Sequence, residues 1–189
     1  GIFIPFNNTY ENVKFLRNLI DQGVRCFYGH MTWSLVNAVT DQLNSEYVVV
    51  TTAILRDPIS RSTSHYIYNI LTRNETRLPD TFLNDTQDHM TEYLGDGNVE
   101  RALYVLKHEI SFIGITEQYH QTLAYWLATR FLTHYDEVVH YKSHKVVTDL
   151  SMASLAEEVK TLAPLYNKND MILYQHALEI FASQLVEVE

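Results

Sequence analysis

Residues 54–66 read Ile54-Leu55-Arg56-Asp57-Pro58-Ile59-Ser60-Arg61-Ser62-Thr63-Ser64-His65-Tyr66, and in them an apolar run meets the start of a helix. The run from Tyr47 to Leu55 is apolar and rich in valine, as buried parallel strands are. Asp57 suits an N-cap, and Pro58 suits the first helical position. The stretch therefore predicts a strand that leads directly into a helix.

The same junction carries several groups that bind anions. A helix N-terminus has free backbone N–H groups and a partial positive charge, and Arg56 adds a planar set of donors suited to phosphate oxygens. Ser60 and Ser64 are one turn apart on one helix face, so a hydroxyl can join these donors. The pattern indicates a phosphate site. The alternative is that Arg56 pairs with a carboxylate and that Asp57 and Pro58 are ordinary capping residues.

Strands and helices alternate along the rest of the chain. The expected strands are residues 1–6, 24–28, 47–55 and 112–116. The expected helices are one that ends at Gly23, followed by residues 58–71, 99–108, 119–135, 154–162 and 169–186. Ser154 with Glu157 forms a capping box for the helix over 154–162. Residues 138–147 are expected to be extended or loop.

This alternation predicts an α/β fold, a three-layer sandwich with a central, mostly parallel sheet. Residues 1–189 are expected to form one domain, in which the polar residues 73–98 form an irregular lid with at most one short helix. Ligands of such sheets bind outside the carboxyl ends of the strands. The residues that follow strands, and that we expect to converge there, are Thr9, His30, Arg56 and Thr116.

The composition argues against several classes of protein. The net charge is −9, with 14 Lys and Arg against 23 acidic residues, so a broad surface for nucleic acid or polyanions is not expected. The chain has no run of about 18 apolar residues, so no membrane span is predicted. One cysteine, Cys26, excludes an intramolecular disulfide and is typical of a reducing compartment. No established spacing of metal ligands occurs, so no metal site is predicted.

The stretch from Arg56 to Tyr66 resembles the 3′-phosphate-binding segment of sulfotransferases that use 3′-phosphoadenosine-5′-phosphosulfate (PAPS). Members related to heparan sulfate 2-O-sulfotransferase, and the broader carbohydrate and bacterial group, carry Arg-Asp-Pro-Ile-x-Arg-x-x-Ser-x-Tyr in this segment. Other fragments are similar to the same family in the same order. They are Phe27-Tyr28-Gly29-His30, Ile113-Gly114-Ile115-Thr116-Glu117, Lys142-Ser143-His144-Lys145, and Asp170 with Leu173-Tyr174-Gln175-His176-Ala177.

The resemblance implies a P-loop-like sulfotransferase fold and the transfer of a sulfuryl group from PAPS to a hydroxyl of a glycan, lipid or small metabolite, without a metal. It implies that His30 is the catalytic base and that Arg56 and Ser64 bind the 3′-phosphate. The remaining nucleotide contacts that it implies are Asn7, Asn8 and Thr9 on the 5′ side, and Lys142, Ser143 and Lys145 in a loop that closes over the nucleotide.

The first loop departs from the family pattern. The family usually has Pro-Lys-x-Gly-Gly-Thr-Ser there, whereas this chain has Ile4-Pro5-Phe6-Asn7-Asn8-Thr9, which is shorter and lacks glycine and lysine. Three explanations stay open: the loop is degenerate, further residues belong between Pro5 and Thr9, or another cation replaces the lysine. The alternative function is therefore a catalytically impaired relative that binds PAPS or its product, adenosine 3′,5′-bisphosphate.

The acidic balance also bears on the acceptor and the compartment. It favours a neutral glycan, a lipid or a small hydroxyl compound over a long polyanion. The charge and the single thiol favour a bacterial-type cytoplasmic enzyme, whereas glycosylation sequons at Asn7, Asn74 and Asn84 fit a Golgi luminal domain. The sequence indicates no oligomeric state.

Overall fold

The computed structural model describes residues 2–3, 9–24, 27–130 and 150–186. In these ranges the chain is mostly helical with short parallel strands, so it is broadly an α/β protein. The elements in chain order are β1 (Ile2–Phe3), α1 (Thr9–Asp21), β2 (Phe27–Tyr28), α2 (Trp33–Leu43), β3 (Thr52–Leu55), α3 (Pro58–Arg73), α4 (Pro79–Asp85), α5 (His89–Gly95), α6 (Val99–His108), β4 (Phe112–Ile115), the 3-10 turn η1 (Thr116–Gln118), α7 (Tyr119–Arg130), α8 (Leu150–Tyr166) and α9 (Lys168–Val186). Within the described ranges, no helix is long and apolar enough to cross a membrane.

The described strands form two separate parallel pairs, not the single central sheet that the alternation predicts. β1 pairs with β2, and β3 pairs with β4 with Leu55 opposite Ile115. β3 is also shorter than the expected strand over 47–55. Val48 is 95% exposed and Ile54 is 58% exposed, and a parallel strand normally has both faces covered. The apolar run of residues 47–55 is therefore longer than the strand that forms from it, Thr52–Leu55.

β4 is buried along its whole length, and its glycine brings α7 close. A Cβ on Gly114 would lie 2.4 Å from Cγ2 of Thr122. The Thr122 hydroxyl accepts from the Ile115 N–H at 2.9 Å and donates to the Ile115 carbonyl at 3.0 Å. The absence of a side chain at Gly114 thus lets α7 bond directly to the strand. The part of the expected helix beyond Arg130, and the segment 138–147, lie outside the described residues.

α3 begins where the sequence predicts. Asp57 precedes it, and its Oδ1 accepts from the Ser60 N–H at 2.7 Å, so Asp57 is the N-cap and Pro58 is the first helical residue. The helix ends at Arg73, and Asn74 follows in the left-handed region at φ 54°. Residues 54–66 are therefore a strand-to-helix junction, as predicted.

The segment 73–98 contains two helices, α4 and α5, so the prediction that this segment is irregular with one short helix is wrong, and its role as a lid on the acceptor side stays a prediction. Aspartates cap the starts of α5 and α9 reciprocally. Asp88, just before α5, accepts from the Asp170 N–H at 3.0 Å. The Asp170 carboxylate accepts in turn from the N–H groups of Met90 and Thr91, at 2.9 and 2.7 Å. These bonds connect segments about eighty positions apart, which local sequence patterns do not encode.

Two further helices differ from expectation. The sequence analysis does not predict α2, which buries Trp33 and Leu43. α8 begins at Leu150, so Ser154 lies inside the helix and is not an N-cap, which corrects the predicted capping box. α6 and α9 agree with the predicted ranges to within one residue.

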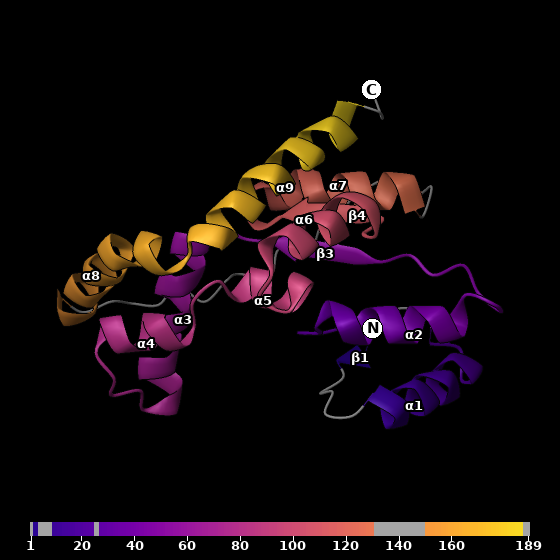
Figure 1. The fold of residues 1–189 in the computed structure, drawn as a ribbon, viewed down its shortest axis with the longest axis horizontal. Helices are drawn as coiled ribbons and strands as arrows, with labels where there is room; N and C mark the ends of the chain where they lie inside the picture. Colours follow the sequence, from indigo (N-terminus) through magenta and orange to yellow (C-terminus); the bar gives the residue numbers. More distant parts are fainter. Residues whose placement is uncertain (1, 4–8, 25–26, 131–149, 187–189) are drawn as a thin grey trace.

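Figure 1 shows three groups of elements. α3, α4 and α8 lie together at one end, α5, α6, α7 and α9 surround β3 and β4, and α1 and α2 lie together beside β1. Separate buried clusters support the first two groups. The central cluster includes Trp33, Leu55, Leu106, Ile113, Ile115, Leu173 and Phe181. The end cluster consists of Tyr66, Ile67, Phe82, Leu83, Val159 and Ala163.

Candidate functional site

Arg56 lies at the carboxyl end of β3, and its side chain is 41% exposed. Its Nε is 3.9 Å from Oε1 of Glu117, which follows β4. The same oxygen accepts from the Asp57 N–H at 3.2 Å, and Oε2 accepts from the Tyr174 hydroxyl at 2.8 Å. Burial and the neighbouring Glu117 carboxylate raise the pKa of Tyr174. Arg56 therefore has the acidic neighbour that the capping alternative expects, but the guanidinium stays open to solvent.

The backbone at the start of α3 offers fewer free donors than the sequence suggests. The Asp57 side chain occupies the Ser60 N–H at 2.7 Å, Glu117 occupies the Asp57 N–H, and Pro58 has no N–H. The groups that stay available for an anion are the Arg56 guanidinium and the exposed residues Ser60 and Ser64. An anion at this junction would therefore be held mainly by side chains.

Two histidines from distant segments lie close together beside α3. The rings of His65 on α3 and His89 on α5 have centroids 6.3 Å apart, and His89 lies 4.6 Å from the Tyr93 ring. Burial, together with the charges of Arg61, His65 and His30, lowers the pKa of His89 to about 4. His30 follows β2 and is exposed. Arg61 is the permanent positive charge among these groups, and Asp170 and Asp88 offset it in part.

Arg61 connects the histidines to the core. Its side chain is 16% exposed, its Nη2 donates to Oδ1 of Asn167 at 3.1 Å, and it lies 3.8 Å from Oδ2 of the buried Asp170. Its Nε is buried and has no partner among the described residues. Burial lowers the pKa of Arg61, and Arg56 contributes in the same direction. The sequence predicts Arg61 as an ion-pair partner on the helix surface. The pair exists, but the side chain is mostly buried.

The predicted site residues are thus distributed over two sheets. Thr9 opens α1 after β1, and His30 follows β2, whereas Arg56 and Thr116 follow β3 and β4. The prediction that these four meet at one edge of a single sheet is therefore wrong. The Thr116 hydroxyl already donates to the Leu55 carbonyl at 3.0 Å. The predicted contacts Asn7, Asn8, Lys142, Ser143 and Lys145 lie outside the described residues.

Sequence reasoning missed His65, Arg61 and His89 as members of this neighbourhood. Arg61 and His65 are one turn apart in α3, so their proximity could be found from helical spacing. No local signal indicates His89, because its position depends on the caps between α5 and α9. No group of three or more histidine, cysteine or acidic side chains in the described ranges is arranged to hold a metal ion.

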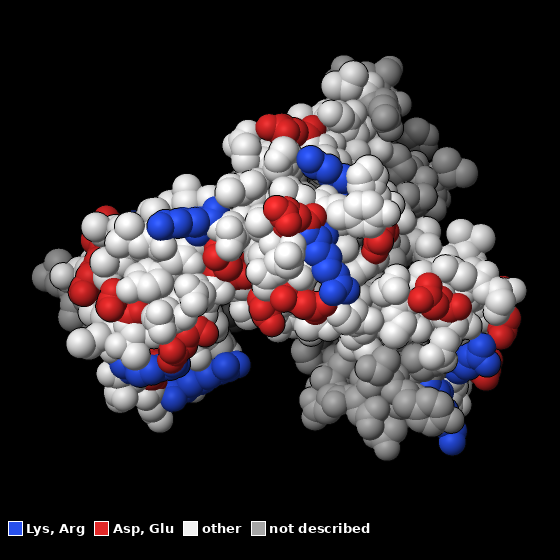
Figure 2. Space-filling model, viewed as in Figure 1, with Lys and Arg blue, Asp and Glu red and all other residues white. Residues whose placement is uncertain are grey.

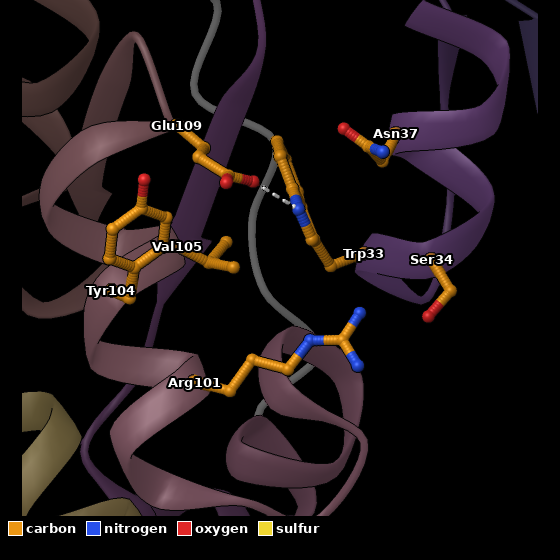
Figure 3. A pocket seen from close by; sticks show the side chains of 7 residues that line it. All are labelled: Trp33, Ser34, Asn37, Arg101, Tyr104, Val105 and Glu109. Atoms are coloured by element: carbon orange, nitrogen blue, oxygen red, sulfur yellow. Dashed lines mark hydrogen bonds between the residues drawn. The ribbon is translucent and has the colours of Figure 1, made fainter. Parts of the chain in front are cut away.

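Charge is mixed over the surface. Figure 2 shows acidic and basic side chains interspersed on the face that it presents. That face has no extended basic area of the kind that binds nucleic acid backbones. A separate concavity lies between α2 and α6, at the other edge of the β3–β4 pair (Figure 3).

No family model, curated protein or solved structure matches this chain. The case for a function therefore depends on the residues and their geometry.

Proposed function

We propose that the protein is a sulfotransferase that moves a sulfuryl group from PAPS to a hydroxyl of a glycan, lipid or small metabolite. The single observation that carries this proposal is the exposed guanidinium of Arg56 at the junction of β3 and α3. It lies next to a helix that presents Ser60 and Ser64, one turn apart, to solvent.

The donors near the junction fit a phosphate group. Arg56 provides a planar, charged set of N–H donors, and the serine hydroxyls provide neutral donors. The buried Nε of Arg61 has no partner among the described residues, and the charge of Arg56 acts on Arg61 together with those of Asp170 and Asp88. A bound dianion would be attracted to both guanidinium groups, because opposite charges attract at close range.

Bound PAPS would supply an activated sulfuryl group. Arg56 and Ser64 would hold its 3′-phosphate and so fix the position of the nucleotide. His30, which is exposed and follows β2, would accept the proton of the acceptor hydroxyl as general base. The contacts that we assign to the rest of the nucleotide are Thr9, Asn8, Asn7, Lys142, Ser143 and Lys145.

The proposal includes the finer description of the fold, a P-loop-like three-layer sandwich. Two features support it: both strand pairs are parallel, and each strand is followed by a helix or helical turn. A second candidate function is a PAPS-binding relative without catalysis. The observation that favours it is the segment Ile4–Thr9, which lacks the lysine and glycines that would surround the 5′-phosphosulfate.

Calorimetric titration with adenosine 3′,5′-bisphosphate tests the nucleotide site. We expect saturable binding that Arg56→Ala abolishes. Arg73→Ala, at the exposed end of the same helix, is the matched control and should keep it. An intact protein that does not bind the nucleotide would refute the proposal.

Transfer of labelled sulfate from PAPS to a panel of hydroxyl compounds separates the two candidates. We expect transfer that His30→Ala removes and that His176→Ala, a change of the histidine that lies 3.3 Å from Glu179 on α9, leaves intact. Nucleotide binding without transfer to any acceptor would favour the catalytically impaired relative.

A further inference from the structure

The cleft between α2 and α6 is a second candidate binding site, separate from the Arg56 junction (Figure 3). Its volume is about 410 Å³, within the range of about 300–1,000 Å³ that is typical of small-molecule sites. Glu109 fixes its place in the fold, because the Thr51 hydroxyl donates to the Glu109 carbonyl at 2.9 Å just before β3 begins. The cleft therefore lies at the amino edge of the β3–β4 pair, and Arg56 lies at the carboxyl edge.

Two aromatic side chains line the cleft. Trp33 is held by a hydrogen bond of 2.6 Å from its Nε1 to Oε2 of Glu109. Tyr104 is 56% exposed, and its ring lies 4.9 Å from that of His108. Held aromatic rings provide apolar surface at a low entropic cost, and their polar atoms can still bond.

The polar side chains of the cleft have unused bonding capacity. Tyr104 has no hydrogen bond through its hydroxyl to any residue that the structure describes, and Glu109 uses one carboxylate oxygen for Trp33. Asn37 makes one long bond, from its amide nitrogen to Asp41 at 3.3 Å, which leaves its carbonyl oxygen free. Arg101 uses Nη1 for Asp96 at 2.7 Å and extends below Trp33 toward α2 (Figure 3). The cleft thus presents donors and acceptors together.

Charge decides which ligand suits this mixture. The carboxylates of Glu109 and Asp96 would repel an anion in the cleft, and the guanidinium of Arg101 would repel a cation. A neutral molecule with several hydroxyls can donate to Glu109 and Asn37 and accept from Arg101, because each hydroxyl is both donor and acceptor. The C–H face of a sugar ring can lie against the exposed ring of Tyr104, next to the edge of the cleft that Trp33 lines. We propose that this cleft binds a neutral saccharide of one or two rings, independently of the nucleotide site.

Titration of the whole chain with maltose, cellobiose and lactose, followed by tryptophan fluorescence and calorimetry, tests the proposal. We expect saturable binding of at least one disaccharide in the millimolar range, with a change in emission because Trp33 lines the cleft. Asn37→Ala and Tyr104→Ala should each weaken binding about tenfold or more, roughly 1.4 kcal/mol. Tyr68→Ala removes an exposed tyrosine of similar exposure (50%) from α3 and should leave it unchanged.

Three results would overturn the assignment. One is no saturable signal from any of the disaccharides up to about 50 mM, where even weak specific sites fill. Another is binding that survives both Asn37→Ala and Tyr104→Ala, which would place the sugar elsewhere. The third is that tetramethylammonium binds and the sugars do not, which would make the cleft a cation site. Circular dichroism of each variant establishes that it is folded.

Discussion

Replacing Asp170 with asparagine should destabilise the protein strongly. The Asp170 side chain is fully buried. Its carboxylate accepts from the N–H of Met90 at 2.9 Å and from the N–H and hydroxyl of Thr91 at 2.7 and 2.8 Å, and it lies 3.8 Å from Arg61. Asparagine keeps one acceptor oxygen but turns an NH₂ group toward a neighbouring donor, so at least one buried N–H loses its partner.

The magnitude follows from these contacts. Hydrogen bonds to a charged acceptor contribute about 1.5–3 kcal/mol each, and removing one partner of a buried ion pair destabilises by about 3–5 kcal/mol. Burial raises the pKa of Asp170 against the opposing effects of Met90, Thr91 and Arg61, so desolvation offsets part of the gain. We therefore expect Asp170→Asn to lower the free energy of unfolding by about 2–3 kcal/mol.

Urea unfolding followed by circular dichroism measures this change. With a slope of about 2 kcal/mol per molar urea, the midpoint should fall by about 1–1.5 M. Asp85→Asn is the matched control, since the Asp85 side chain is 49% exposed and pairs with Arg77 at 2.7 Å. It should change stability by less than about 1 kcal/mol. Equal midpoints for Asp170→Asn and the wild type would refute the reciprocal caps between α5 and α9.

Substitutions of Glu117, His89 and Trp33 should change nucleotide binding or stability in directions that the contacts determine. Glu117→Gln should tighten adenosine 3′,5′-bisphosphate binding about two- to fivefold in calorimetry, because it removes a partly screened negative charge 3.9 Å from Arg56; weaker binding would contradict this. The pKa of His89 is about 4 in the folded chain and 6.5 when unperturbed, so the unfolded state binds more protons between these values. Stability should therefore rise with pH across that window, by about 1–2 kcal/mol after discounting for solvent screening, and His89→Gln should flatten the slope in unfolding titrations. Trp33→Phe removes the donor to Glu109 and should cost about 1–2 kcal/mol in thermal unfolding, and an unchanged Tm would count against that bond.

Local chemistry made the junction of β3 and α3 predictable. Asp57 caps α3 through a bond to the residue three positions later, and Pro58 opens the helix, so every contact that specifies the start is encoded within a few residues. The same holds for α6, where Asn98 accepts from the Arg101 N–H at 2.8 Å. Secondary structure with its own caps can be predicted from one sequence.

Strand pairing and the lid could not be predicted in this way. The pattern of residues 47–55 shows that they are apolar, but whether they form a strand depends on a partner elsewhere in the chain. Among the residues that the structure describes, the strand partner of β4 is Thr52–Leu55. α4 and α5 have seven residues each, shorter than helices that are stable alone. Asp88 and Asp170 help to hold α5 in place from a distance, so its existence depends on the tertiary fold.

The same caps hold His89 near Arg61, whose charge interacts with that of Arg56 at the proposed phosphate position. Asp170 holds the start of α5 and lies 3.8 Å from Arg61, so it keeps His89 and Arg61 in one neighbourhood. The pKa of His89 is low because burial and nearby positive charges oppose its protonation. A nucleotide phosphate at Arg56 would add negative charge to that field and would raise the pKa of His89 from about 4.

Imidazole chemical shifts, followed by NMR from pH 3 to 8 with and without saturating adenosine 3′,5′-bisphosphate, measure this coupling. We expect the titration of His89 to move toward its ordinary value of 6.5 when the nucleotide is bound. A bound nucleotide that leaves the titration of His89 unchanged would mean that its phosphate lies outside the neighbourhood of Arg61 and His89.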